Sequence, residues 1–333
     1  MSRKSFCFVV LSYNHQDYIL EHLESIKYQI ETFGENFDVQ LIINDDASKD
    51  NTVRLIELWL KSNSALFSRV NLLFNDANLG TCQSLCNCLR LLQSDYCKLT
   101  AGDDVYSCEN IFELIDYTSE ADVVTAIPVR LIGNELTISR SEVIFTFGME
   151  YVYNSLAEIT LGINFINAPN ALYQSRYLNN PEMLDFLSKY DVVEDWPIHI
   201  FIANKNPDAK FKVVDKCYVY YRRTPGSTYL IASKRLKCDV YKIYDYLLST
   251  KMGVWSRFKL KNRRYCFGLS SPLLKKVLNI SLMIYLSKTL LNWWGINKKL
   301  SSFSCINNLE ACQKYYHCIA EQSTLYFNEA DDK

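Results

Sequence analysis

Two acidic residues, Asp103 and Asp104, stand side by side in the stretch KLTAGDDVY, which covers residues 98–106. Two unit charges about 4 Å apart repel each other by roughly 1 kcal/mol in water, and by more where protein excludes water. Such a pair is stable in a solvated turn or helix cap, or where a positive group lies against it. The pair is therefore the first candidate for a functional site.

The elements that would position this pair alternate between strand and helix. Apolar runs typical of strands cover 6–14, 39–46, 70–76 and 96–99, and apolar stripes at helical spacing cover 17–32, 49–61 and 81–92. This order predicts an α/β fold with a parallel sheet and helices on both faces. Ligands of such sheets bind beyond the carboxyl ends of the strands.

Polar clusters fall at those predicted strand ends. They are Ser12–Tyr13–Asn14, Asp45–Asp46, Asn75–Asp76 and Asp103–Asp104. The sequence has neither G-x-G-x-x-G after the first strand nor G-x-x-x-x-G-K-[ST] anywhere, which argues against dinucleotide and P-loop sites. The carboxyl edge is thus predicted to be a rim of oxygen-bearing side chains.

The rest of the chain is less regular and unevenly charged. We expect a strand near 122–133, strands over 211–228 that end in a Pro-Gly loop, and helices over 181–189 and from 194 onward. Residues 1–245 carry 23 Lys/Arg and 32 Asp/Glu, whereas 246–309 carry 11 Lys/Arg and no acid. This asymmetry predicts a partner surface for the basic segment.

The 12 cysteines have irregular spacings, and the apolar run 6–11 is too short for a signal peptide. We therefore expect reduced thiols in a cytosolic protein. Cys82 and Cys86 share a helical stripe with Leu85 and Leu89. For these cysteines core packing is favoured over a metal site.

Five landmarks in order resemble the family-2 glycosyltransferases. They are LSYN (11–14), NDDASKDNT (44–52), NDANLG (75–80), GDDVY (102–106) and VEDW (193–196), and the likeness covers roughly residues 5–230. The resemblance implies the GT-A fold, a Rossmann-like mixed, mainly parallel sheet flanked by helices. We expect a domain over 1–245, divided into a nucleotide-binding half (1–120) and an acceptor half (121–245), and a helical C-terminal extension over 246–333.

The resemblance implies that a hexosyl or N-acetylhexosaminyl group moves from a nucleotide diphosphate, here expected to be UDP, with inversion at the anomeric carbon. Asp103 and Asp104 would hold Mn²⁺ or Mg²⁺ against the diphosphate, because hard cations prefer carboxylate oxygens. The family pattern D-x-D-D has Ala101 at its first position here. Which of the two acids binds the metal directly, and which supports it or contacts the nucleotide, stays open.

The resemblance also places nucleotide contacts at the other strand ends. Asp46, or alternatively Asp45, would accept a hydrogen bond from the base, although the same residues suit an ordinary turn. Further contacts are expected from Ser12, Tyr13, Asn14, Asn78 and Gly80. Tyr13 would stack on the base, and Gly80 would permit close backbone approach.

The base that deprotonates the acceptor hydroxyl is assigned by the resemblance to Asp195, with Glu194 beside it; a simple helix cap is the alternative. Trp196 is either an acceptor-sugar platform or a core residue. In the loop YRRTPGST (221–228), Thr224 stands where many members have a metal-binding His, so water would replace that ligand. Arg222 or Arg223 would pair with phosphate oxygens or be solvated.

Residues 251–295 combine basic, aromatic and aliphatic side chains, with Asn279, Lys288 and Asn292 interrupting the apolar run 277–295. Two interpretations are open: a peripheral helix at the inner face of a membrane, or packed helices with solvated lysines. The first would suit a lipid-linked glycan acceptor. We expect no nucleic acid partner, because no base-stacking motif is present.

Three other functions are alternatives to a glycosyltransferase. A sugar-nucleotide pyrophosphorylase needs a Gly-rich basic loop after the first strand, which LSYNHQDY lacks. A processive synthase needs several membrane spans and a Q-x-x-R-W motif, which are also missing. A catalytically inactive, membrane-recruited nucleotide-sugar or glycan-binding protein stays open because of Ala101 and Thr224.

Overall fold

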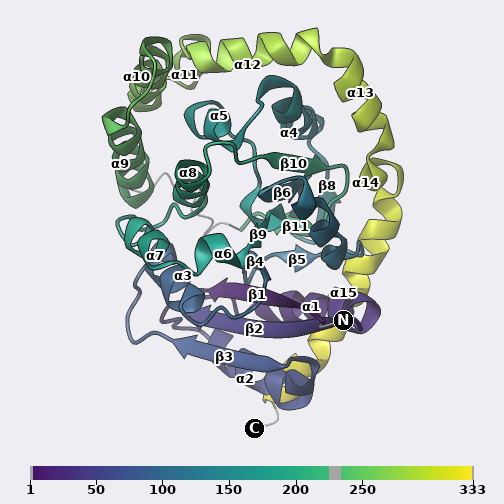
Figure 1. Ribbon diagram of the computed structural model, residues 1–333. Coiled ribbons are helices and arrows are strands. Elements are labelled where there is room, and N and C mark those ends of the chain that lie inside the picture. Colours follow the sequence, from purple (N-terminus) through teal and green to yellow (C-terminus); the bar gives the residue numbers. More distant parts are fainter. Residues whose placement is uncertain (1–2, 225–233, 332–333) are drawn as a thin grey trace.

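A computed structural model describes residues 3–224 and 234–331, and its centre is a seven-stranded sheet (Figure 1). The strand order is β10-β6-β9-β4-β1-β2-β3. The bounds are β1 (Lys4–Ser12), β2 (Phe37–Asp45), β3 (Arg69–Phe74), β4 (Tyr96–Ala101), β6 (Val123–Ala126), β9 (Leu172–Gln174) and β10 (Phe211–Val214).

Within this sheet β1, β2, β3 and β4 are parallel, and β9 runs antiparallel to β4 and β6. The register pairs Ser12 with Asp45 and Leu11 with Ala101. The carboxyl ends that carry the predicted polar clusters therefore meet at one edge. The predicted mixed, mainly parallel sheet flanked by helices is confirmed.

A second sheet of four strands has the order β5-β11-β7-β8. Its strands are β5 (Val105–Tyr106), β7 (Val129–Ile132), β8 (Glu135–Thr137) and β11 (Val219–Arg222). The single strand expected over 122–133 is wrong, because β6 and β7 belong to different sheets. Pro128 lies between them and has no N–H to continue a ladder.

The core lies on both faces of the large sheet, because its strands are apolar on both sides. In β1, the side chains of Phe6, Phe8 and Val10 pack into one cluster with α1 and α2, whereas Cys7 and Val9 pack into the other with α3. Cys82, Cys86, Cys88 and Cys97 are buried free thiols in this second cluster.

The helices before the C-terminal region have the following bounds. They are α1 (Ile19–Phe33), α2 (Thr52–Asn63), α3 (Thr81–Leu89), α4 (Arg140–Val152), α5 (Leu156–Leu161), α6 (Ser175–Leu178), α7 (Pro181–Leu187) and α8 (Asp195–Lys205), with 3₁₀ turns η1 (Ser64–Leu66), η2 (Ile111–Ser119) and η3 (Ala168–Asn170). The helices expected over 17–32, 49–61, 81–92 and 181–189 correspond to α1, α2, α3 and α7.

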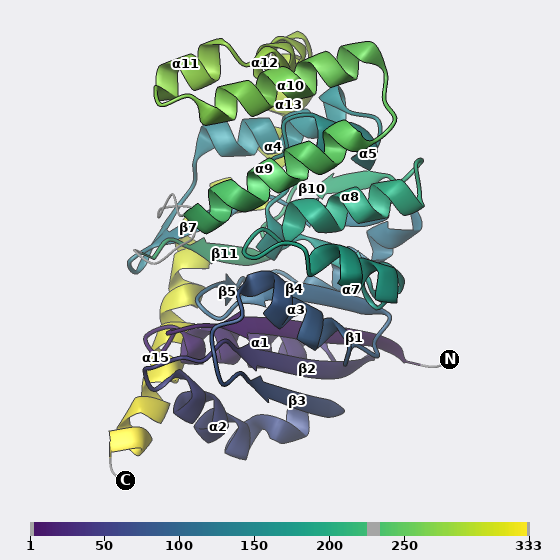
Figure 2. The ribbon, with the colours of Figure 1, turned by 90° about the vertical axis from the view of Figure 1, so that its left-hand side faces the viewer.

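The C-terminal helices form an arc around the rest of the chain (Figures 1 and 2). They are α9 (Lys234–Ser249), α10 (Val254–Gly268), α11 (Pro272–Val277), α12 (Ile280–Leu291), α13 (Trp293–Ser302), α14 (Ser304–Asn307) and α15 (Leu309–Asp331). α12 and α13 pack on α4, and α15 packs on α1 and α2. Across the described residues, every helix is too short or too polar to traverse a bilayer.

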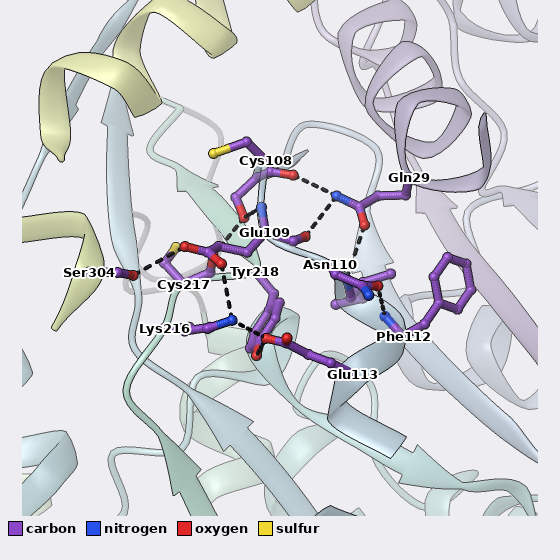
Figure 3. A network of polar contacts seen from close by, with 12 residues as sticks. Gln29, Cys108, Glu109, Asn110, Phe112, Glu113, Lys216, Cys217, Tyr218 and Ser304 are labelled. Atoms are coloured by element: carbon purple, nitrogen blue, oxygen red, sulfur yellow. Dashed lines mark hydrogen bonds and ion pairs between the residues drawn. The ribbon is translucent and has the colours of Figure 1, made fainter. Parts of the chain in front are cut away.

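A polar network fixes the segment that follows the acidic pair (Figure 3). The Gln29 side chain on α1 donates to the Ser107 and Glu109 carbonyl oxygens at 2.6 and 3.0 Å. Lys216 forms ion pairs with Glu109 at 3.3 Å and Glu113 at 2.7 Å. These contacts hold the chain after β5 against α1 and against the loop before β11.

Candidate functional site

The acidic pair lies in the turn between β4 and β5, as the sequence predicts. Asp103 and Asp104 are both buried. Asp104 Oδ1 accepts a hydrogen bond from the Arg222 backbone N–H at 3.0 Å, whereas its Oδ2 is buried with no hydrogen-bond partner. Burial and the neighbouring Asp103 raise the pKa of Asp104 well above its usual range. An unpartnered buried carboxylate oxygen beside a second carboxylate fits a cation site.

The described residues supply no third His, Cys, Asp or Glu ligand for a metal at this pair. Within 3–224 and 234–331, no group of three or more His, Cys, Asp or Glu side chains is placed to share one metal ion. Thr224, which replaces the expected His, lies with its Oγ1 3.5 Å from Asp103 Oδ2. The donor set within the described residues is therefore the two carboxylates.

Arg222 braces the acidic turn. Its Nε donates to the Asp103 carbonyl oxygen at 2.6 Å, and its Nη2 pairs with Glu21 on α1. The side chain is 4% exposed, and its guanidinium lies over the Tyr18 ring, 4.8 Å from the centroid. The Arg222 side chain is thus held by contacts within the protein. Arg223 is more exposed, at 37%, and lies 3.7 Å from Glu142.

Asp46 holds the loop that follows β3. Its carboxylate accepts from the Leu79 and Gly80 backbone N–H groups at 2.7 and 2.9 Å and from the Asn75 amide at 2.9 Å. A carboxylate has about four acceptor positions, so one is left for a ligand. The turn role and the nucleotide role predicted for Asp46 are compatible.

Asp45, the alternative nucleotide contact, is likewise hydrogen-bonded within its own turn. Its oxygens accept from the Ser12 hydroxyl at 2.9 Å and from the Ser48 N–H and hydroxyl at 2.8 and 2.6 Å. Ser12 therefore joins the ends of β1 and β2 instead of facing solvent. Both Ser12 and Asp45 are buried.

Two residues without glycine's freedom adopt left-handed backbone conformations at this rim. They are Asn14, with φ 54°, and Ala47, with φ 65°. Asn14 accepts from the Lys49 N–H at 2.8 Å and its own N–H donates to the Ser48 hydroxyl at 2.7 Å, which latches the two loops together. Strain of this kind is typical of functional sites. Tyr13, beside Asn14, is 45% exposed and available to stack on a ligand.

Gly80 lies where the loop after β3 meets the segment before α8. Its φ is 86°, and a Cβ there would lie 2.2 Å from Asp191 Oδ1. Asn78 accepts from Arg235 at 3.4 Å, and Arg235 also forms a bidentate pair with Asp191. Gly80 is therefore required for close packing against the 191–193 segment.

The second acidic pair stands at the start of α8. Burial, followed by the charge of Asp195, raises the pKa of Glu194 to about 8. Burial also raises the pKa of Asp195. The hydrogen bond from the Trp196 N–H to Asp195 Oδ1, at 2.7 Å, partly opposes this rise. Near neutral pH Glu194 therefore mostly holds a proton.

Tyr221 is on β11, next to Arg222, whose backbone N–H is bonded to Asp104. Burial, then the charges of Asp104 and Asp103, and further that of Glu194, raise the pKa of Tyr221. The pKa of the Tyr221 phenol thus responds to residues of both acidic pairs.

Trp196 is anchored in the protein. Its Nε1 donates to the Thr160 carbonyl oxygen at 3.1 Å, its ring packs edge-on against Tyr244, and Arg263 lies over it. These contacts belong to a packed tryptophan, and an acceptor role stays a prediction. The part of the loop 221–228 beyond Thr224 lies outside the described residues.

Three further residues near the candidate site were not predicted from the sequence. Asp239 and Arg235 on α9 bind the 191–193 segment, and the pKa of Tyr221 on β11 responds to residues of both acidic pairs. Asp239 and Arg235 are remote in sequence from their partners and belong to no short motif. The aromatic run YVYY before Arg222 offered a signal for Tyr221, but its strand pattern is that of any half-buried strand.

Known proteins resemble this chain in sequence and in fold. The model of the family described as "Glycosyl transferase family 2" matches residues 7–180. Abequosyltransferase RfbV of Salmonella typhimurium is 33% identical over 121 residues, which is 36% of this chain and 34% of that protein. An uncharacterized protein of Mycobacterium tuberculosis, Rv1520, is 31% identical over 99 residues, 30% of this chain and 27% of that protein. The match thus spans about a third of the length of these curated relatives.

Solved structures share the fold at low sequence identity. The crystal structure of S. aureus TarS 1-349 in complex with UDP-GlcNAc aligns with a TM-score of 0.57 and 15% identity, over 90% of this chain and 92% of that one. A mannosyltransferase from Pyrobaculum calidifontis, PcManGT, in complex with GDP-Man and Mn²⁺ aligns with a TM-score of 0.53 and 14% identity, over 96% of this chain and 86% of that one.

Proposed function

Because the chain belongs to glycosyl transferase family 2, we propose that it is a metal-dependent, inverting glycosyltransferase that uses a nucleotide-sugar donor. One observation carries this proposal. Asp103 and Asp104 are buried together in the turn after β4, and Asp104 Oδ2 has no hydrogen-bond partner. This pair suits the leaving group, and the pair Glu194 and Asp195 at the start of α8 suits the attacking hydroxyl.

Asp103 and Asp104 would hold Mn²⁺ or Mg²⁺. A divalent cation bound there neutralises negative charge that develops on the departing diphosphate. Arg222 keeps the turn in place through the Asp103 carbonyl oxygen and the Asp104 carboxylate. Arg223 is the better placed arginine for phosphate oxygens, because Arg222 is already bound to Glu21.

Asp195 would act as the general base. The acceptor oxygen attacks the anomeric carbon as the bond to the diphosphate breaks, and the hydroxyl proton passes to Asp195 Oδ2. Oδ1 is held by the Trp196 N–H, which fixes the orientation of the carboxylate. The raised pKa of Glu194 keeps a second negative charge away from the base. A positioned base typically contributes about 10²–10⁴ in rate.

The nucleotide would bind along the rim formed by Tyr13, Asn14, Asp45 and Asp46, with Asp46 as the principal base contact. UDP is our proposed nucleotide, and the structural relatives include complexes with both UDP-GlcNAc and GDP-Man. For the sugar we propose a hexosyl or N-acetylhexosaminyl group. The acceptor would be a glycan or a lipid-linked glycan at the cytoplasmic face of a membrane, as in cell-surface polysaccharide synthesis.

The domain division stays part of the proposal: a nucleotide half over 1–120, an acceptor half over 121–245 and a helical extension over 246–333. The extension packs into the same core as the acceptor half, through residues such as Tyr285, Ile296 and Phe303. It therefore supports the acceptor half directly.

Thermal unfolding of the full chain with UDP, GDP or ADP, each with and without Mn²⁺, tests donor and metal together. We expect stabilisation by UDP that requires Mn²⁺. Asp195→Asn should keep this stabilisation and lose transfer, whereas the exposed Asp185→Asn should keep both. Transfer by Asp195→Asn near the parent rate would show that another group is the base. Nucleotide binding without any transfer would favour the catalytically inactive alternative.

A further inference from the structure

The helices α10 to α13 expose an unusual amount of apolar surface. Nineteen large apolar side chains are exposed in the described part of the chain, and thirteen of them lie within residues 254–294. Trp294, Val254 and Leu291 are 89%, 88% and 85% exposed. Soluble proteins rarely concentrate such side chains unless the surface meets a partner.

These exposed side chains recur on one side of each helix. On α10, Trp255, Phe258 and Tyr265 follow helical spacing, and Trp255 stacks on Phe258 with ring centroids 5.4 Å apart. On α12 and the start of α13, Met283, Leu290 and Trp294 do the same. The inward sides of these helices are occupied by buried residues such as Leu260 and Tyr285. The helices are therefore amphipathic, with the outer side left uncovered.

The helices form one continuous surface. α10 packs on α11 and α12, and α12 packs on α13. Asn262 of α10 donates to the Leu278 carbonyl oxygen at 3.0 Å and accepts from the Ile280 N–H at 2.9 Å, which ties the turn between α11 and α12 to α10. Figure 2 shows α10, α11 and α12 together at the end of the molecule opposite β3 and α2. We call this the α10–α13 surface.

The charge of the α10–α13 surface has one sign. Of the 11 basic residues in 246–309, Arg264 and Lys299 form ion pairs with acidic side chains in the described structure, and the others do not. Lys251, Lys261 and Lys276 are exposed among the apolar residues. Protein interfaces are depleted in lysine at their centres, whereas lysine beside Trp, Tyr and Leu suits a layer of anionic headgroups.

From this combination we infer that the α10–α13 surface docks the protein on the surface of an anionic lipid bilayer. The apolar side chains enter the boundary between headgroups and acyl chains, and the lysines meet the anionic headgroups. The contact lies along the surface, because α12 has 12 residues and spans about 18 Å, less than the roughly 30 Å of a hydrocarbon core.

Vesicle flotation of the full chain, without donor or metal, tests this inference separately from catalysis. We expect at least about tenfold stronger partitioning onto phosphatidylcholine vesicles containing phosphatidylglycerol than onto phosphatidylcholine alone, weakened by high salt. Lys261→Glu combined with Lys276→Glu should remove most of the preference for anionic vesicles. Lys61→Glu, an exposed lysine on α2, is the matched control and should leave binding unchanged.

A second pair of variants examines the apolar part. Leu291→Ser combined with Trp294→Ser should reduce vesicle binding at least about tenfold without lowering the melting temperature, because both side chains are exposed. Leu325→Ser, 64% exposed on α15, is the control. Equal binding to both vesicle types would overturn the inference. So would self-association that shields the tryptophans while vesicle binding is absent.

Discussion

The Asp239 carboxylate on α9 accepts hydrogen bonds from the Asp191 backbone N–H at 2.7 Å and, through the same Oδ2, from those of Val192 and Val193 at 2.7 and 3.3 Å. Asp239 is fully buried. These three N–H groups directly precede Glu194 and Asp195, so one carboxylate fixes the approach to the second acidic pair.

We predict that Asp239→Asn lowers kcat by about 10–100-fold while KM for the donor changes little. An amide is a weaker acceptor, so the segment loosens and the base loses its position. Steady-state kinetics with varied donor measure the split. Asp245→Asn, on the same helix but exposed, should leave both constants near the parent values. A loss of donor affinity alone would contradict a positioning role.

Gly80 and Gly133 both have positive φ values, 86° and 59°, but different surroundings. A Cβ at Gly80 would strike Asp191, whereas one at Gly133 has nothing within 4 Å. Gly133→Ala should cost about 1 kcal/mol of unfolding free energy from backbone strain, and Gly80→Ala at least about 1 kcal/mol more. Urea unfolding measures both. Gly80→Ala should also weaken UDP binding, because the Gly80 N–H holds Asp46.

Asp104 reduces stability when no cation is bound, because its pKa is raised by burial and by Asp103. Deprotonation of a group with a raised folded-state pKa removes stability as pH rises. Asp104→Asn should therefore raise the melting temperature of the metal-free protein at pH 7.5, and the difference should shrink at low pH. The variant should also lose stabilisation by UDP with Mn²⁺. Asp116→Asn, an exposed control, should do neither.

Glu194 gives a separate dependence on pH. Its pKa is raised from 4.5 to about 8, so the stability linked to its protonated form is full below 4.5 and is lost as pH rises toward 8. Glu194→Gln resembles the protonated form and should reduce the fall in melting temperature between these values. Scanning calorimetry across this range measures the slope. Glu310→Gln, exposed on α15, should follow the parent; if Glu194→Gln does as well, the carboxyl group titrates normally.

The parallel strands could be predicted because β1, β2 and β4 are apolar on both faces, which leaves a strong local pattern. The gathering of polar residues at one edge followed from topology alone. Arg222 could not be placed in this way, because its partner Glu21 lies 201 residues away. Ala47 gives no sequence sign of its left-handed backbone, which results from the latch between the loops after β1 and β2.

Pro128 was a local sign that 122–133 divides into two strands, whereas the partners of Asp239 depend on tertiary contacts that no local window contains. Trp196 shows the same limit. Its type and position suit a sugar platform, but only the contacts with Thr160 and Tyr244 reveal how far it is enclosed.

The return of α15 to the N-terminal helices has a consequence for folding. Tyr315 packs on Tyr28 with ring centroids 4.7 Å apart, and the Asn63 amide donates to the Tyr326 hydroxyl at 2.9 Å. During synthesis, the first Rossmann-like units leave the ribosome long before α15 exists. Because contacts this distant in sequence are slow to form, the surfaces of α1 and α2 that α15 covers stay exposed until α15 has been synthesised.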